Sequence, residues 1–323
     1  MSFVGIDLGG TNVRLVLVDS SGHILARATE PTLPERGADV TLAAIIESVR
    51  RLEANALSPI EAIGIGVTGP VDPLTGIVVN PYTLGGWPAT DVREPFVSAF
   101  AKPVAVDNDA NAAAIGEWWM GAARGFKRVA MVTFGTGIGV ANVVEGKVQR
   151  AVDGRHGEAG HMVLNPEGPA CYCGANGCWE SLASGTALGR AAREVALRKD
   201  GELWRLAAGD LANVDAKLLF EAGAKGDGRA KAVVDEAARW IGLGLVNLAS
   251  TTTPDVFIVA GGMGGHLETM RPVIEEVLRR HSALVPTNVP VVLAQLEDDA
   301  GSIGAAKLAM DCAHPDLYPP NIP

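Results

Sequence analysis

Three of the four cysteines lie in one short segment, GPACYCGANGCWES at residues 168–181. The C-x-C-x₄-C spacing lets Cys171, Cys173 and Cys178 converge on one metal ion. A disulfide framework would need an oxidising compartment and would leave one thiol unpaired, whereas a redox pair normally shows C-x-x-C. We therefore expect a zinc site, for which three cysteines and one histidine form a recognised ligand set.

His161 is the nearest histidine that could complete this set, because only the turn NPEGP and a few residues separate it from Cys171. Four protein ligands leave no open position, so the expected zinc is structural. Glu158 and Glu180 flank the segment. As isolated residues they would be interpreted as solvated charges, but their place beside the metal loop leaves a binding role open. The isolated Cys312 is expected to be a buried, inert thiol.

A second candidate is the carboxylate in VAVDNDANAAA at residues 104–114, where a strand runs into a helix. Asp107 or Asp109 could be the N-cap of that helix, a frequent role of aspartate. Alternatively, Asp109 could be a general base that accepts the proton of a hydroxyl attacking a γ-phosphoryl group. Asn108 can donate and accept hydrogen bonds, which suits a hydroxyl-rich ligand. The residues alone leave both interpretations open.

Three glycine-rich turns, DLGGTN, FGTGIG and AGGMGG, follow apolar strands. Glycine lets backbone N–H groups approach an anion, and Thr11 and Thr136 add hydroxyl donors. Asp7 could hold Mg²⁺ through water. The first two turns are neither P-loops nor dinucleotide fingerprints. Each turn alone is typical of a tight hairpin, but together they favour a nucleotide site.

The segments that carry these side chains alternate between predicted strands and predicted helices. This alternation predicts an α/β fold. Residues 3–28 and 128–152 both read as strand, turn, strand, turn, strand, so we interpret them as a divergent internal repeat. Two related lobes with a cleft between them follow from this repeat, and a phosphate-containing ligand is expected in the cleft.

The expected division of the chain has three parts. A smaller lobe covers 1–109 and receives a helix at about 300–312. A larger lobe covers 110–299 and contains the zinc loop at 161–178. A Pro-rich tail at 313–323 is expected to be extended.

Bulk properties narrow the class of protein. A chain of 323 residues is long for one core, and its 48% apolar and 20% charged residues are ordinary for a globular protein. A formal charge of −10 argues against nucleic acid and anionic membranes as partners. Few cysteines, no signal-peptide pattern and no apolar run of membrane-spanning length predict a cytoplasmic protein.

Together, the motifs IDLGGTN, DNDANAAA, TFGTGIG, GEAGH and CYCGANGCWESLASG resemble the ROK family of bacterial sugar kinases and sugar-responsive repressors. The likeness runs in order from Val4 to about Ala309. Trp179 and the segment SGTAL look most like the glucokinase branch. The resemblance implies an actin-like (ribonuclease H-like), duplicated two-lobe ATP-dependent sugar kinase of carbohydrate metabolism and glycolysis. A homodimer or a dimer of dimers is implied as well.

The resemblance also implies residue roles and cofactors. Asp109 matches the catalytic base at the sugar 6-hydroxyl. The residues matched to sugar contacts are Asn108, Asp109, Glu158, His161 and Glu180, and His161 would also bind the structural Zn²⁺. ATP with Mg²⁺ is the implied phosphoryl donor. The residues matched to phosphate contacts are Asp7, Gly9, Gly10, Thr11, Asn12, Gly135, Thr136 and Gly137, and those on the adenosine side are Gly261 and Gly262.

Two departures from the family pattern concern the sugar pocket. Val140 and Ala141 stand where two more glycines are usual, and NPYTLGGW offers Tyr82 or Thr83 where an asparagine is common. Glu158 favours glucose over N-acetylmannosamine, whose kinases tend to have histidine there.

The expected reaction is phosphorylation of D-glucose to glucose 6-phosphate, with mannose, fructose or N-acetylglucosamine as alternative substrates. Polyphosphate is a less favoured donor than ATP, since a more basic phosphate path would be expected for it. A sugar-sensing regulator is also less favoured, because no helix-turn-helix segment precedes Val4 and the acidic charge opposes DNA binding.

Overall fold

A computed structural model describes residues 1–54, 56, 58–151, 154 and 156–314. The chain forms two compact units. Unit 1 consists of Met1–Val129, Ala141–Gly157 and Ala294–Pro323, and unit 2 consists of Ala130–Val140 and Glu158–Leu293. Nearly all of the Pro-rich tail expected at 313–323 lies outside the described residues. Within the described ranges, no helix is both long and apolar enough to cross a membrane.

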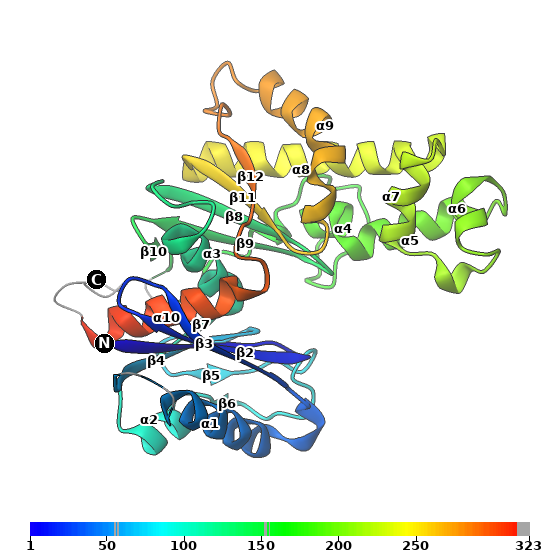
Figure 1. The fold of residues 1–323 in the computed structure, drawn as a ribbon. Helices are drawn as coiled ribbons and strands as arrows, with labels where there is room; N and C mark the ends of the chain where they lie inside the picture. Colours follow the sequence, from blue (N-terminus) through cyan, green and yellow to red (C-terminus); the bar gives the residue numbers. More distant parts are fainter. Residues whose placement is uncertain (55, 57, 152–153, 155, 315–323) are drawn as a thin grey trace. The chain divides into compact units, whose positions relative to one another are not determined.

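Two five-stranded sheets share one topology, which confirms the expected α/β duplication (Figure 1). The first sheet has the order β3 (Ile24–Pro31), β2 (Asn12–Asp19), β1 (Ser2–Leu8), β4 (Ile60–Val67) and β7 (Val104–Asn108). The second has the order β10 (Lys147–Val148), β9 (Ile138–Val144), β8 (Arg128–Phe134), β11 (Val256–Ala260) and β12 (Val291–Leu293). In each, the first three strands in sequence form a meander. A small pair, β5 (Ile77–Val78) and β6 (Thr90–Asp91), completes the described strands.

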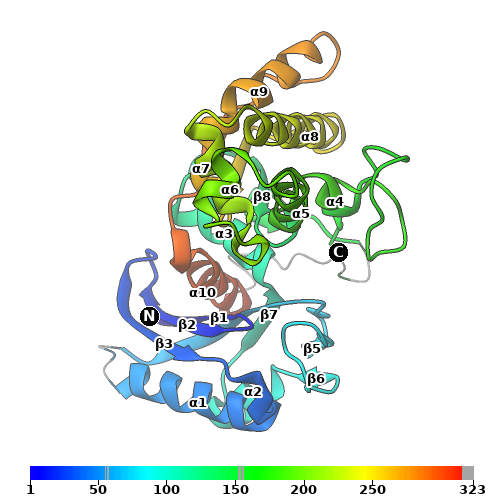
Figure 2. The ribbon, with the colours of Figure 1, turned by 90° about the vertical axis from the view of Figure 1, so that its right-hand side faces the viewer.

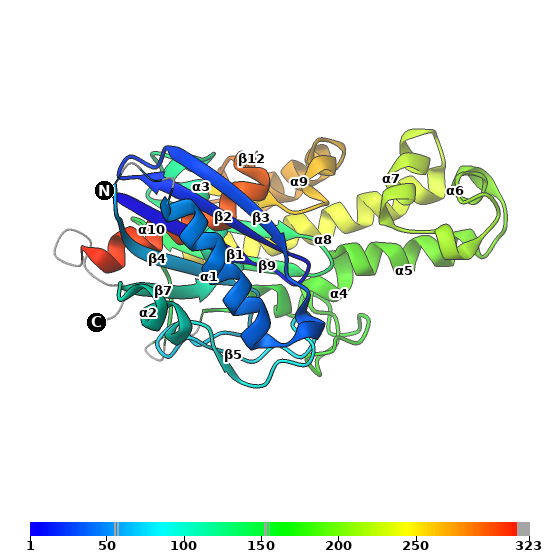
Figure 3. The same cartoon turned by 60° about the horizontal axis from the view of Figure 1, so that its bottom comes forward.

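In unit 1 the alternation of side chains along β1 places helices on both faces of the first sheet. The even-numbered residues Val4, Ile6 and Leu8 share a core with helix α1 (Ala38–Ala54), which lies across the sheet in Figure 3. Phe3 belongs to a second core on the other face, with helix α10 (Ala300–Ala313). Because Asp7 continues the odd-numbered series, its carboxyl group points toward the start of α10, where it lies beside Gly301.

Glycines in the strands bring α10 against the sheet. A Cβ atom on Gly5 would lie 1.8 Å from the Ser302 carbonyl oxygen, and one on Gly64 would lie 1.8 Å from that of Ala305. Helix α3 (Asp109–Met120) packs on α10 in the same way, since a Cβ on Gly304 would lie 1.6 Å from the Ala112 carbonyl oxygen. Helix α2 (Glu94–Phe100) contacts α1.

Unit 2 is built around α8 (Gly228–Thr252), whose buried side chains join the core formed with the second sheet. Around α8 pack α4 (Trp179–Ala183), α5 (Gly185–Ala196), α7 (Ala216–Ala224) and α9 (Leu267–Arg280), as Figure 2 shows, and α6 (Gly201–Leu206) packs on α5 and α7. Trp179 is fully buried and packs edge-on against Phe134, with ring centroids 5.8 Å apart.

Unit 1 does not end where the smaller lobe was expected to end. The segments 110–129, 141–157 and 294–299 belong to unit 1, whereas the division at residue 109 assigned them to the larger lobe. Helix α10 does belong to unit 1. The lobe boundary at 109 stays a prediction.

Candidate functional site

Asp109 is the first residue of α3 and follows β7 directly. The cap of this helix is Asn108, whose Oδ1 accepts hydrogen bonds from the backbone N–H groups of Ala110 at 2.9 Å and Asn111 at 3.4 Å. The Asp109 side chain accepts hydrogen bonds from the Ala110 N–H and from the Asn108 side chain. Burial raises the pKa of Asp109 above its ordinary value. A carboxylate with a raised pKa that is not the cap is suited to accept a proton.

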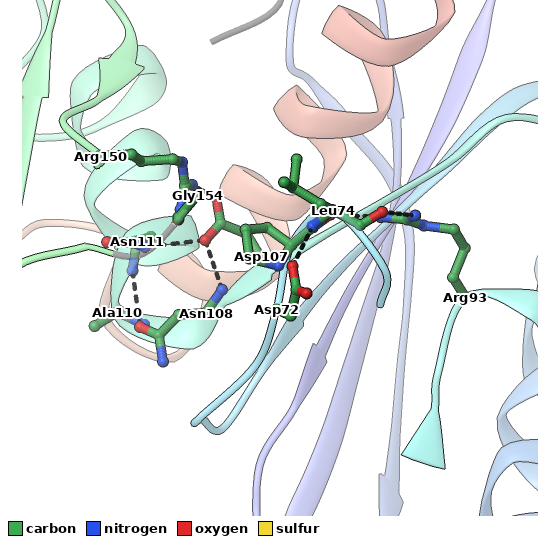
Figure 4. Close-up of polar contacts among 10 residues, drawn as sticks. Asp72, Leu74, Arg93, Asp107, Asn108, Ala110, Asn111, Arg150 and Gly154 are labelled. Carbon is green, nitrogen blue, oxygen red and sulfur yellow. Dashed lines mark hydrogen bonds and ion pairs between the residues drawn. The ribbon is translucent and has the colours of Figure 1, made fainter. Parts of the chain in front are cut away.

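Asp107 anchors the strand end beneath this junction (Figure 4). It is 2% exposed, accepts hydrogen bonds from the Asn111 amide at 2.9 Å and the Asn108 N–H at 2.6 Å, and pairs with the guanidinium of Arg150. Arg150 also donates to the Gly154 carbonyl oxygen. This buried ion pair holds the segment after β10 against the junction that carries Asp109. The alternative role of Asp107 as a helix cap does not apply.

Asp7, at the end of β1, lies among charged groups of unit 1. Burial and the neighbouring charge of Asp109 raise the pKa of Asp7 to about 7, while Arg14 opposes this shift. Arg14 is the register partner of Asp7 on β2 and forms an ion pair of 2.9 Å with Asp298. A Cβ on Gly301 would lie 2.7 Å from the Asp7 carboxyl carbon, so that position needs a glycine. A cation bound beside Asp7 would relieve the unfavourable interaction of its carboxylate with the charge of Asp109.

The predicted metal ligands do converge. The ligand atoms of His161, Cys171, Cys173 and Cys178 all lie within 4.8 Å of one another. Nδ1 of His161 is 3.5 Å from Sγ of Cys171, and the Sγ atoms of Cys173 and Cys178 are 3.5 Å apart. A tetrahedral zinc with ordinary bond lengths gives an S···S edge of about 3.8 Å and an N···S edge of about 3.6 Å. The donor set therefore fits zinc in both chemistry and spacing.

None of the four cysteines, which are all within the described residues, forms a disulfide. The Sγ–Sγ separation of 3.5 Å between Cys173 and Cys178 is far longer than an S–S bond. Cys312 is exposed at the end of α10, so its expected burial was wrong.

Backbone hydrogen bonds shape the metal loop. The N–H of Cys171 donates to Ala175 at 2.8 Å, and the N–H of Trp179 donates to Met162 at 2.8 Å, which brings Cys178 beside the His161 segment. Gly177 has a φ of +66°, and a Cβ there would lie 1.5 Å from the Asn165 carbonyl oxygen. Glycine is required at this point because both the conformation and the approach exclude a side chain.

Glu180 is held against the turn after β8. Its Oε2 accepts a hydrogen bond of 2.7 Å from the Ile138 N–H, and a Cβ on Gly137 would lie 2.2 Å from that oxygen. Gly137 thus makes room for the Glu180 carboxylate. Glu158 is exposed at the start of the short 3₁₀ helix Ala159–His161, and Gly160 of that helix packs on the Ile138 carbonyl. The motifs GTGIG, GEAGH and GCWES therefore meet around β9.

Three glycine turns of unit 2 also meet. The N–H of Gly185, at the start of α5, donates to Gly135 at 2.8 Å, and the hydroxyl of Thr186 donates to the Thr136 carbonyl at 2.8 Å. Gly261 has a φ of +85° and lies against Phe134. A Cβ atom on Gly262 would meet no heavy atom within 4 Å, so the surroundings of that residue are open. Ser184 is the N-cap of α5. The segment SGTAL therefore forms a third loop beside the two glycine turns, and the sequence alone indicates no role for it.

The turn between β1 and β2 is separate and belongs to unit 1. The N–H of Gly9 donates to the Asn12 carbonyl at 3.1 Å, and Thr11 is exposed. A Cβ on Gly10 would lie 3.1 Å from Thr83. Thr83 is positioned by the buried Asn80, whose amide donates to the Thr83 hydroxyl. Of the two residues offered in place of the family asparagine, Thr83 faces this turn and Tyr82 is 87% exposed.

The candidate residues thus form two groups within unit 1 and two within unit 2. In unit 1 these are the carboxylates around Asp109 and the turn at 9–12; in unit 2 they are the metal loop with Glu180 and the turns at 135–137 and 261–262. Val140 is buried in the core of unit 2 and Ala141 is buried as well, so both serve strand packing. Sequence reasoning did not identify three residues near these groups: Arg14, Asp298 and Tyr172. Nothing in their spacing along the chain marks them, and only the fold brings them to these groups.

The duplicated sheets and the surrounding helices define the actin-like, two-domain class of sugar kinases. The chain matches the ROK family model over residues 3–312, and it belongs to the ROK family. It is 33% identical over 309 residues to a glucokinase of Thermotoga maritima, covering 95% of this chain and 97% of that one.

Two solved structures are also similar. A ROK hexokinase from Thermus thermophilus has a TM-score of 0.84 and 35% identity, over 96% of this chain and 98% of that one. A ROK glucokinase from Streptomyces griseus, determined in complex with glucose and AMPPNP, has a TM-score of 0.76 and 35% identity, over 96% of this chain and all of that one.

Proposed function

We propose that this protein transfers the γ-phosphoryl group of ATP to the 6-hydroxyl of a hexose, with D-glucose as the preferred acceptor. Support comes from the relatives named glucokinase, from the glucose and AMPPNP in one similar structure, and from the site geometry. The observation that carries the proposal is the carboxylate of Asp109, which has a raised pKa and is not the helix cap.

Asp109 is the proposed general base. It accepts the proton of the 6-hydroxyl as that oxygen attacks the γ-phosphorus, and the bond between phosphorus and the leaving oxygen of ADP breaks. Burial favours proton uptake by this carboxyl group. Asn108 uses Oδ1 for the cap, and its side chain also bonds to the Asp109 carboxylate, so its second amide N–H is the one proposed to contact a sugar hydroxyl.

The remaining sugar contacts are proposed from Glu158, His161 and Glu180 of unit 2. Glu180 is held by the Ile138 N–H and by the room that Gly137 provides, so its second oxygen has a fixed direction. His161 presents Nδ1 to the thiols and Nε2 to the opposite side. A rigid arrangement of acceptors and donors is what selection among hexose epimers requires.

The phosphate contacts are proposed from the glycine turns. These are the turn at Gly9, Gly10, Thr11 and Asn12 and the turn at Gly135, Thr136 and Gly137, with Gly261 and Gly262 on the adenosine side. Asp7 is the proposed carboxylate toward the Mg²⁺ that accompanies ATP, since a cation relieves the repulsion between Asp7 and Asp109. When bound, Mg²⁺ neutralises phosphate charge.

Structural zinc is proposed at His161, Cys171, Cys173 and Cys178. Four protein ligands leave no open position, so the ion would supply folding energy and no catalytic step. The ion would fix the positions of His161 and Glu180, which lie at the two ends of the metal loop.

The test is a coupled assay of the purified protein with ATP over glucose, mannose, fructose, N-acetylglucosamine and N-acetylmannosamine. The expected result is turnover with the highest kcat/KM for glucose. A higher kcat/KM for another of these sugars would change the substrate but keep the class of enzyme. No turnover on any of them, with sugar binding intact, would favour the sugar-sensing regulator instead.

A homodimer in the cytoplasm is proposed from the family resemblance. Size-exclusion chromatography with light scattering is expected to give twice the mass of one chain at micromolar concentration. A mass of one chain under these conditions would reject the dimer.

A further inference from the structure

Tyr172, the residue between the first two cysteines of the metal loop, carries a hydroxyl that reaches the proposed sugar ligands. Its oxygen lies 3.2 Å from Nε2 of His161, and the two rings meet edge to face with centroids 5.2 Å apart. Tyr172 is nevertheless 79% exposed. The hydroxyl contact and the edge-to-face ring contact, both with His161, therefore hold this largely exposed side chain in place.

Tyr172 contacts the His161 ring nitrogen that is not directed at the metal site. Nδ1 of His161 faces the Sγ of Cys171 at 3.5 Å, so Nε2 is the ring atom available to a ligand. In a histidine bound through Nδ1, the proton is on Nε2. The Tyr172 oxygen can then accept this N–H.

Glu180 forms a side-chain hydrogen bond with Tyr172, and Glu158 acts on it through its charge. The O–H group accepts from His161 and donates to Glu180, which is the pattern a sugar hydroxyl would make.

We propose that Tyr172 is a plug that occupies the hydrogen-bonding positions of a sugar hydroxyl on His161 and Glu180 until the sugar displaces it. This inference rests on the proposed function and adds a residue that sets the affinity for the acceptor. Sugar binding must break the contacts of Tyr172, so part of the binding free energy is used for displacement. A ligand that lacks a hydroxyl at this position cannot replace both contacts.

The test compares the full-length, zinc-loaded protein with its Tyr172→Phe variant. Phenylalanine keeps the ring and removes the competing hydroxyl. Calorimetric titration with D-glucose is expected to show a Kd roughly threefold to tenfold lower in the variant, the equivalent of about one hydrogen bond. The KM for glucose should fall by a similar factor, with kcat unchanged. Zinc content is measured in both proteins to exclude damage to the loop.

A second variant and a sugar-free measurement complete the design. Tyr172→Ala is expected to bind glucose at least as tightly as wild type, whereas weaker binding would mean that the ring contacts the sugar and would overturn the plug. Long-range ¹H–¹⁵N correlation of His161 should shift its Nε2 signal in Tyr172→Phe without any sugar. An unshifted signal, or an unchanged or higher Kd, would also overturn it. If wild type binds none of the hexoses, the proposed function fails together with the plug; binding without a gain in the variant defeats the plug alone.

Discussion

At the scale of single residues, the proposed catalytic role and the helix-capping role belong to two different residues, Asp109 and Asn108. Asn108 caps α3, so replacing Asp109 by asparagine removes the base without removing the cap. We expect Asp109→Asn to lower kcat by roughly 10²-fold to 10⁴-fold, because general base catalysis contributes about that much. The coupled assay measures kcat, and thermal unfolding checks that the fold survives.

The matched control for this variant is Asp235→Asn. Asp235 lies in α8, pairs with Lys231 one turn earlier and is not among the proposed sugar or nucleotide contacts. It should leave kcat at the wild-type value. An Asp109→Asn enzyme that keeps near-normal kcat would reject Asp109 as the base.

The other residue-scale prediction concerns pH and Asp7. Its pKa is about 7 in the folded chain and near 3.8 in the unfolded chain, so between these values the folded state binds more protons. The free energy of unfolding therefore falls as pH rises through this window. The raised pKa of Asp109 acts in the same direction. Without nucleotide or magnesium, urea unfolding at pH 5 and pH 8 should show this loss of stability.

Asp7→Asn removes the titrating group and should make the loss between pH 5 and pH 8 smaller than in wild type. Asp235→Asn, at a partly exposed position of α8, should keep the wild-type difference. The same pH dependence in Asp7→Asn and wild type would contradict the raised pKa of Asp7.

At the scale of elements, Glu117 joins the end of α3 to the segment that leads into α10. It is fully buried; Oε2 accepts the Ala122 N–H at 2.8 Å, and Oε1 accepts those of Gln295 at 2.9 Å and Leu296 at 2.7 Å. The two bonds to Gln295 and Leu296 fix where the chain enters α10, whose first turn lies beside Asp7.

Glu117→Gln places an amide N–H₂ against backbone N–H donors, so at least one buried donor loses its acceptor. We expect a loss of about 3 kcal/mol in the free energy of unfolding, since hydrogen bonds to charged groups are strong and unsatisfied buried donors are costly. Urea denaturation measures this. Glu275→Gln, at an exposed position of α9, should change it by less than about 0.5 kcal/mol. If Glu117→Gln lowered the free energy of unfolding no more than Glu275→Gln, the Glu117 contacts would contribute little to stability.

At the scale of the whole molecule, zinc content links the metal loop to the stability of the chain. We expect about one zinc per chain, because one set of four ligand atoms lies within the spacing of a single ion. Cys173→Ser should lose most of the zinc and lower Tm, since the loop would lose a ligand and the remaining thiols would repel one another once ionised.

Cys312→Ser is the control, because that exposed thiol lies at the end of α10 and outside the ligand set. Elemental analysis should find wild-type zinc in it and an unchanged Tm. A wild-type protein that is fully active and stable without zinc, or a Cys173→Ser protein with full zinc, would contradict the structural site.

The sequence by itself determined the family, the duplicated α/β topology and the chemistry of the metal ligands. These follow from local patterns: apolar strands with glycine turns repeat twice, and the cysteine spacing with His161 defines a donor set. The carboxylate at residue 109 could also be located from its strand–helix junction. What remained open was whether it capped the helix, because capping depends on the backbone angles of three adjacent residues.

The tertiary structure decided contacts that the spacing of residues in the sequence does not reveal. Only the packed sheet places Arg14 and Asp298 beside Asp7, and only the folded loop brings the Tyr172 hydroxyl to His161 and Glu180. Such contacts depend on which face of a strand meets which turn of a helix, and sequence spacing carries no information about that. The glycines show both levels, since their positions are visible in the sequence but the close approach of Gly5, Gly64 and Gly304 that requires them exists only after α10 packs.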